Sequence, residues 1–191
     1  IKGEGTIQGN DSKAVIVNAG TDTVAIVGGQ INGYKGISTE RGIIKVLGGT
    51  INTTDYAIYN GSTGEIYVLG GTITSQDNSI HNNSTGSVVI SGTGNVTGVK
   101  AVFNKDAGII TVAENAKLTG TVEGSKMSET GKVIVKGGTV DGKIDGIYIR
   151  EKYRIRCYNC DDSYISLEMK GKKGDLTYKR RDLISKEEYL L

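Results

Sequence analysis

Ile44-Lys-Val-Leu-Gly-Gly-Thr-Ile51 and Ile66-Tyr-Val-Leu-Gly-Gly-Thr-Ile73 are nearly identical stretches that begin 22 residues apart. The apolar residue that closes each stretch has counterparts at spacings of 20 to 24 residues, namely Ile7, Ile31, Ile51, Ile73, Val96, Leu118 and Val140. Self-similarity with a period of about 20–50 residues is typical of solenoids and other repeat architectures. The first part of the chain is therefore a repeat.

Each repeat holds two further short apolar motifs. One recurs as Ala57-Ile58-Tyr59-Asn60, Ser79-Ile80-His81-Asn82 and Ala101-Val102-Phe103-Asn104. The other is a pair of apolar residues two positions apart, as in Ile66 and Val68. Stacking such units buries faces that no single unit can bury alone. The pattern predicts a parallel β-solenoid of about seven coils over residues 1–142. A run of antiparallel hairpins is the alternative, but hairpins do not require the same residue type every 22 residues.

The register of the repeat predicts three stacked rows. We expect Ile58, Ile80 and Val102 in the core, Tyr59, His81 and Phe103 in an outward ladder, and Asn60, Asn82 and Asn104 in a ladder of side-chain amides. The aromatic ladder has two interpretations, an inert surface or a stacking surface for carbohydrate. We expect Asp55, Asp77 and Asp106 to lie in turns without a basic partner, so no catalytic residue is predicted in the solenoid.

Composition changes sharply near Gly142. Of the 29 Gly, 26 precede residue 143, and both cysteines follow it. The change predicts a solenoid over 1–142 and a second domain over 143–191. Cys157-x-x-Cys160 is a single pair, whereas a zinc site needs four ligands. No apolar stretch approaches the length of about 18 residues that a transmembrane helix needs. The first residue is Ile and no signal peptide is visible, so we expect a processed product or a fragment.

Alternation in residues 149–182 predicts three strands that place cations on one face. Within each strand these cations are two positions apart, and the set comprises Lys152, Arg154, Arg156, Lys170, Lys172, Lys179 and Arg181. Only Glu168 interrupts it. Like charges directly opposite one another destabilise a sheet, so the pattern favours contact with a polyanion, and a solvated basic face remains the alternative. Ser185-Lys-Glu-Glu188 matches a capping box and predicts the start of a helix.

The repeats resemble the Gly-Gly-Thr-Ile repeats of right-handed β-helices in large surface proteins of Gram-positive bacteria, some of them adhesin-like. The resemblance covers residues 1–142. It implies a right-handed solenoid and a structural stalk or adhesin at the cell surface, without enzymatic activity.

The second part carries a different resemblance. Lys152-Tyr-Arg-Ile-Arg156-Cys-Tyr158-Asn159, Tyr164-Ile-Ser-Leu-Glu168-Met-Lys170, Tyr178-Lys179-Arg180 and Ser185-Lys-Glu-Glu-Tyr189 look like the VTC domain, the polyphosphate polymerase domain named for the vacuolar transporter chaperone. That family belongs to the triphosphate tunnel metalloenzymes, which are antiparallel β-barrels. The resemblance implies that Arg154, Arg156 and Lys170 are phosphate ligands, together with Lys152 and Lys179. It also implies a divalent metal such as manganese, and a cytoplasmic or membrane-associated location.

The departures from that family bear on activity. Solenoid repeats stand where its first strand should be, and its later strands, with a metal-binding glutamate, would follow Leu191. We therefore expect only a partial barrel and an inactive chain, and we assign no catalytic or metal-binding residue. The chain is interpreted as a fragment of a larger fusion or as an artificial join.

Three function classes follow. They are polyphosphate synthesis, binding of polyphosphate or a nucleoside triphosphate without turnover, and a structural surface protein. No specific nucleic-acid partner is expected.

Overall fold

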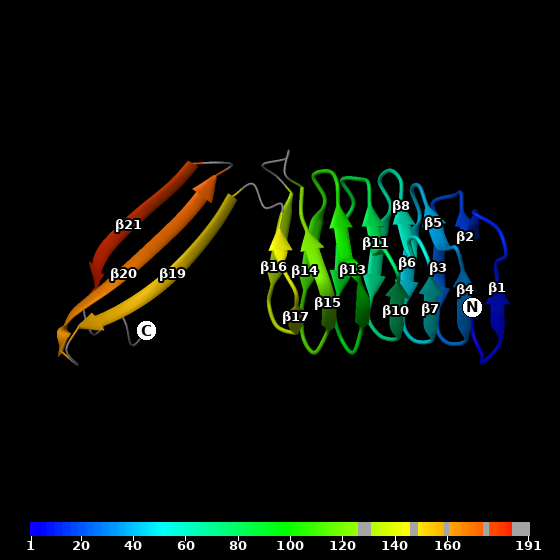
Figure 1. The fold of residues 1–191 in the computed structure, drawn as a ribbon, viewed down its shortest axis with the longest axis horizontal. Helices are drawn as coiled ribbons and strands as arrows, with labels where there is room; N and C mark the ends of the chain where they lie inside the picture. Colours follow the sequence, from blue (N-terminus) through cyan, green and yellow to red (C-terminus); the bar gives the residue numbers. More distant parts are fainter. Residues whose placement is uncertain (126–130, 146–148, 159–160, 174–175, 185–191) are drawn as a thin grey trace. The chain divides into compact units, whose positions relative to one another are not determined.

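A computed structural model describes the backbone of residues 1–125, 131–145, 149–158, 161–173 and 176–184 (Figure 1). Beyond residue 145, side chains are described for 165–170 and 176–183. These residues form 21 strands and no helix, so the predicted all-β class is confirmed. The chain divides into two units, Ile1–Ile147 and Tyr148–Leu191. The helix predicted from Ser185 lies outside the described residues.

The first unit is a parallel β-solenoid built from three rows of strands. The first row contains β1 (Thr6–Gln8), β4 (Gln30–Gly33), β7 (Thr50–Thr53), β10 (Thr72–Ser75), the start of β13 (Asn95–Asn104), the start of β15 (Lys117–Glu123) and β17 (Thr139–Asp141). The second row contains β2 (Ala14–Asn18), β5 (Lys35–Thr39), β8 (Ile58–Asn60), β11 (Asn78–Asn82), the ends of β13 and β15, and β18 (Ile144–Asp145). The third row contains β3 (Thr23–Ile26), β6 (Ile43–Val46), β9 (Glu65–Val68), β12 (Val88–Ile90), β14 (Ile109–Val112) and β16 (Lys132–Val135).

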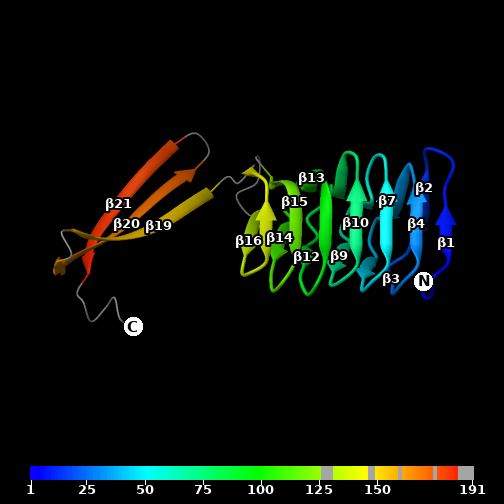
Figure 2. The same ribbon diagram turned by 60° about the horizontal axis from the view of Figure 1, so that its bottom comes forward.

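Strands of successive turns lie side by side in each row (Figures 1 and 2). All pairings between the described strands of this unit are parallel and follow the sequence repeat, for example Ile51 beside Ile73 and Ile73 beside Val96. The hairpin alternative is therefore wrong. The solenoid has about six turns, because the seven recurring positions from Ile7 to Val140 delimit only six intervals. It extends beyond residue 142, since β18 pairs with β15.

The core of the solenoid is a stack of branched aliphatic side chains. Ile58, Ile80 and Val102 are neighbours in register and have no exposed surface, as predicted. Glycine is required at the turn between the third and first rows. Gly49 and Gly71 have φ of 79° and 78°, and a Cβ on either would lie 2.7 and 2.8 Å from the carbonyl oxygen of the glycine one turn earlier. The Gly-Gly-Thr motif thus sets how closely successive turns can stack.

A ladder of buried amides runs along the second row, also as predicted. The Asn60 Nδ2 donates to Asn82 Oδ1 at 2.8 Å, and the Asn82 Nδ2 donates to Asn104 Oδ1 at 2.8 Å. Each amide also donates to the carbonyl four residues ahead, at Gly64, Gly86 and Gly108. Asn60 and Asn82 therefore each form hydrogen bonds both within their own solenoid turn and to the asparagine of the next turn.

The second unit contains one antiparallel sheet in the order β19 (Ile149–Tyr158), β20 (Asp161–Lys173) and β21 (Leu176–Ile184). The three predicted strands are confirmed, and β20 is central. A closed β-barrel is not observed, because β19 and β21 are not hydrogen-bonded to each other in the described sheet. The triphosphate-tunnel architecture therefore stays a prediction.

Candidate functional site

The antiparallel register brings the predicted cations into rows. Lys152 lies opposite Lys170, and Lys170 lies opposite Lys179. Two residues further along each strand, Arg154 lies opposite Glu168, and Glu168 lies opposite Arg181. Directly opposed residues lie on the same side of an antiparallel sheet. We call this side the cationic face, with positions Lys152, Arg154, Arg156, Lys170, Lys172, Lys179 and Arg181.

Glu168 does not interrupt the cationic face, because it forms ion pairs with two of its cations. Its side chain is buried, with 5% of the residue exposed, and its Oε1 lies 2.5 Å from Arg181 Nη2 and 3.8 Å from Lys179 Nζ. A buried carboxylate needs such partners, because an unpaired buried charge is costly. Part of the positive charge of Lys179 and Arg181 is thus balanced within the protein, which the sequence interpretation missed.

The structure describes the side chains of two of the five predicted phosphate ligands and only the backbone of the other three. Lys170 and Lys179 are exposed. Lys152, Arg154 and Arg156 are placed by the backbone register of β19, and their side chains lie outside the described residues, as does the cysteine pair Cys157 and Cys160. Ser166, opposite Arg156, is fully buried, and its hydroxyl has no hydrogen-bond partner.

The described residues do not supply the divalent-metal site that the family resemblance implies. Among them, no three His, Cys, Asp or Glu side chains lie close enough together to hold an ion. Glu168, the carboxylate on the cationic face, is already engaged by Arg181.

A second candidate surface lies on the solenoid. The rings of Tyr59, His81 and Phe103 follow one another on β8, β11 and β13, with centroids 5.3 and 4.9 Å apart. The ring of Tyr56 lies beside this row, with its centroid 5.0 Å from that of Tyr59 and 6.3 Å from that of His81. We call these four rings the aromatic ladder. Burial lowers the pKa of His81 below its usual 6.5, because the ring is partly removed from water. The predicted ladder is confirmed, and Tyr56 is a member that the repeat motif did not reveal.

Lysines lie at both ends of the aromatic ladder. Lys35 Nζ is 5.0 Å from the Tyr56 ring centroid, and Lys100 Nζ is 4.1 Å from that of Phe103, both within cation–π range. Lys35 Nζ also lies 3.7 Å from Asp55. The expectation that Asp55 has no basic partner was therefore wrong, because Lys35 comes from the preceding turn in a position that the 22-residue alignment does not reveal.

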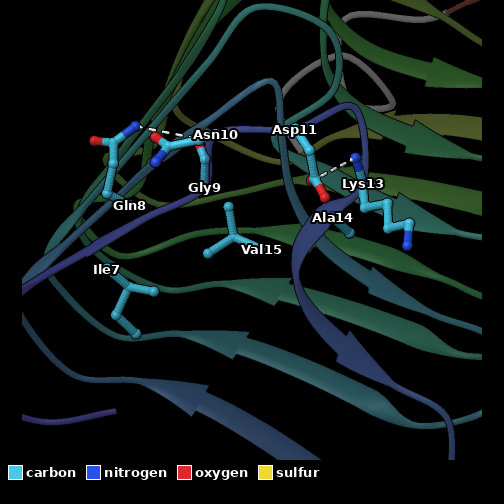
Figure 3. Close-up of a pocket in the computed structure, with 8 residues that line it drawn as sticks. All are labelled: Ile7, Gln8, Gly9, Asn10, Asp11, Lys13, Ala14 and Val15. Carbon is cyan, nitrogen blue, oxygen red and sulfur yellow. Dashed lines mark hydrogen bonds between the residues drawn. The ribbon is translucent and has the colours of Figure 1, made fainter.

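An open cavity of about 400 Å³ lies at the N-terminal end of the solenoid (Figure 3). It is lined by residues 7–11 and 13–15. The apolar side chains are those of Ile7, Ala14 and Val15, and Asp11 accepts a hydrogen bond from the Lys13 backbone N–H at 3.0 Å. The lining contains no histidine or cysteine and resembles an uncovered part of the core more than a catalytic cleft.

None of the described segments is a helix that could cross a membrane. Comparison with known proteins finds no matching family model, no matching curated protein and no matching solved structure.

Proposed function

We propose that the second unit binds a polyphosphate or nucleoside triphosphate chain and that the solenoid is its structural support. The observation that carries this proposal is the row formed by Lys152, Lys170 and Lys179 across three strands. Three like charges side by side destabilise a sheet, and a bound polyanion compensates for them. A phosphate chain suits the row because it offers several charges at regular intervals.

The neighbouring row supports the same ligand. Glu168 holds Arg181 beside the lysine row, and Arg154 is opposite Glu168 in register. Arginine forks bind phosphate oxygens with fixed geometry, whereas lysine contributes a flexible point charge. The arginines of one row can orient the phosphate groups, and the lysines of the other row add positive charge. This proposal concerns binding alone and includes no turnover.

Titration of labelled polyphosphate into the full chain tests the proposal. Lys170→Ala combined with Lys179→Ala should weaken binding at least tenfold, since each charge-assisted hydrogen bond contributes about 1.5–3 kcal/mol. The matched control is Lys173→Ala combined with Arg180→Ala. It removes the same charge from positions on β20 and β21 that alternate with those of the cationic face and so belong to the other side of the sheet. Equal losses in both double variants would show that only net charge matters and would overturn the proposal.

A second function, a surface protein whose solenoid contacts carbohydrate, is favoured by the aromatic ladder. Its rings form a continuous strip across neighbouring turns, and aromatic rings of this kind present an apolar surface with polar handles at Tyr and His. Sugar rings have apolar faces that can lie on such a strip and hydroxyl groups that such handles can bind.

Binding to insoluble polysaccharides tests this second function. Tyr59→Ala with Phe103→Ala should abolish retention, whereas Tyr67→Ala should leave it unchanged. Tyr67 is an outward aromatic residue on β9, in a different row, bonded to Glu65 at 2.7 Å. If the wild-type chain is not retained by any polysaccharide, or if all variants are retained equally, the aromatic ladder has no such role.

A further inference from the structure

The aromatic ladder is surrounded by charges that balance one another. Lys35, at one end, lies 3.7 Å from Asp55, and Lys100, at the other end, lies 2.8 Å from Glu123. The charged groups that form these pairs or act on the His81 ring are three lysines and three carboxylates, namely Lys35, Lys100, Lys105, Asp55, Asp77 and Glu123. Burial also lowers the pKa of His81, which keeps its imidazole uncharged at neutral pH. The surface around the ladder therefore has no net charge, in contrast to the cationic face.

The middle ring of the ladder combines apolar neighbours with polar atoms. The His81 ring is inclined by 64° to the Tyr59 ring and by 80° to the Phe103 ring, so the imidazole stands edge-on between them. Among the residues that the structure describes, none forms a hydrogen bond with the ring nitrogens of His81. A neutral imidazole has one donor and one acceptor nitrogen. The ladder thus offers a donor and an acceptor between two apolar ring surfaces.

The direction of the ladder follows from the register. β8, β11 and β13 belong to successive turns and lie side by side in the second row (Figure 1), so the row of Tyr59, His81 and Phe103 runs along the solenoid axis. The ring centroids in this row are 5.3 and 4.9 Å apart, close to the strand spacing of about 4.8 Å. A six-membered sugar ring is similar in width to an aromatic ring, so an extended polysaccharide chain can place successive sugars over successive turns.

We propose that the ligand of the aromatic ladder is an uncharged polysaccharide whose chain follows the solenoid axis, with sugar faces against Tyr59 and Phe103 and a sugar hydroxyl bonded to His81. This inference rests on the second function proposed above and adds the class of carbohydrate and the direction of its chain. A chain that carries carboxylate or sulfate groups fits less well. Lys35 and Lys100 are already paired with carboxylates, and removing a further, unpaired charge from water is costly.

Retention of the full chain on a panel of polysaccharides, at low and at high salt, tests the class of ligand. The panel holds uncharged cellulose, chitin and xylan, and anionic alginate and polygalacturonate. The measured quantity is the difference in retention between the wild-type chain and Tyr59→Ala with Phe103→Ala, because the cationic face contributes equally to both. An uncharged polymer should show this difference, and high salt should not abolish it, since salt screens only charges.

The other outcomes separate the ligand class from the second function itself. A difference confined to the anionic polymers and lost in high salt would overturn the inference and leave binding of carbohydrate by the solenoid in place. No difference on any polymer would overturn both.

Titration of the wild-type chain with oligosaccharides of the retained polymer tests the direction of the chain. Affinity should rise at least tenfold from the disaccharide to the tetrasaccharide, because a longer oligosaccharide reaches the rings of further turns. A chain that crossed the ladder within one turn would contact fewer rings, and its affinity would not rise with length. That result would overturn the proposed direction.

His81→Phe tests the polar contact without removing a ring from the ladder. Tetrasaccharide binding should weaken about threefold to tenfold, the range expected for one neutral hydrogen bond, while thermal unfolding at neutral pH is retained. The control Tyr67→Phe removes a hydroxyl from an aromatic residue on β9, outside the ladder, and should leave the affinity unchanged. Equal affinities of the wild-type chain and His81→Phe would overturn the role given to His81.

Discussion

Single residues decide how one turn of the solenoid recognises the next. In the asparagine ladder, Asn82 both donates to Gly86 O and Asn104 Oδ1 and accepts from Asn60. At the first asparagine of the ladder, one buried polar atom has no hydrogen-bond partner. Thr39 occupies the equivalent position one turn before Asn60, and the Asn60 Oδ1 has no hydrogen-bond partner. The amide at each step is therefore matched to its neighbours and not only to its own turn.

Replacing Asn82 with Ala should lower the free energy of unfolding by about 2–4 kcal/mol, because several buried hydrogen bonds lose a partner. Asn52→Ala is the control, since Asn52 is exposed and makes one long bond of 3.4 Å to Asn32. Urea unfolding followed by circular dichroism measures both. A loss for Asn82→Ala no greater than that for Asn52→Ala would contradict the structural role of the ladder.

His81 should make the stability of the solenoid depend on pH. Burial lowers its pKa in the folded state below the value of 6.5, so the unfolded chain binds the proton more readily. Stability should therefore be greatest above about pH 7 and fall as the pH drops below about 6.5, until the folded-state pKa is passed. Thermal unfolding between pH 5 and 8 measures this. His81→Phe should remove this component, and an unchanged profile in the variant would show that other groups cause it.

At the scale of elements, register matters more than the strength of any one strand. The strands of the solenoid are two to five residues long apart from β13 and β15, and each relies on strands of the neighbouring turns. In the second unit, register aligns Lys170 with Lys179 and Glu168 with Arg181. A shift by one residue would move each of these side chains to the other face of the sheet.

Ile80→Asp should destabilise the solenoid by several kcal/mol, because it buries an unpaired charge between Ile58 and Val102. Val99→Asp introduces the same charge at an exposed position and should have little effect. Thermal melts of the two variants provide the comparison. If Ile80→Asp melts like the wild-type chain, residue 80 does not lie in the core and the register is wrong.

At the scale of the whole molecule, two units of different construction share one chain. Stability of the solenoid is expected to be a sum over turns and their interfaces. Among its described residues, the second unit is a sheet in which β19 and β21 each pair with β20 only, and closing a barrel requires more strands with consistent tilt and stagger. Binding of a phosphate chain therefore does not require that this chain also catalyse turnover.

The chain should not elongate polyphosphate from ATP when supplied with manganese or magnesium, because three strands do not enclose a phosphate chain. Polyphosphate length, followed by gel electrophoresis over several hours, measures this. An active polyphosphate polymerase assayed in parallel is the positive control. Reproducible elongation by the purified chain would contradict the view that a closed barrel is needed.

The parts of the structure that repeat could be predicted from the amino-acid sequence alone. Recurrence of Ile58, Ile80 and Val102 in one register was enough to predict a core row, because only stacked turns require the same residue type at the same position. The aromatic and asparagine ladders followed from the same alignment. Alternation likewise predicted the three strands of the second unit and the face on which its cations lie.

Contacts between turns and strands that are not part of the repeat became evident only in the folded chain. Lys35 approaches Asp55 and Tyr56 because stacking brings adjacent turns together, and no periodic signal marks that pair. In the sequence, Glu168 is a single acidic residue among cations. In the fold, Arg181 on β21 forms an ion pair with it, which allows the carboxylate to be buried. Periodicity specifies the environment of residues that recur, whereas burial and ion pairs outside the repeat depend on which segments the folded chain brings together.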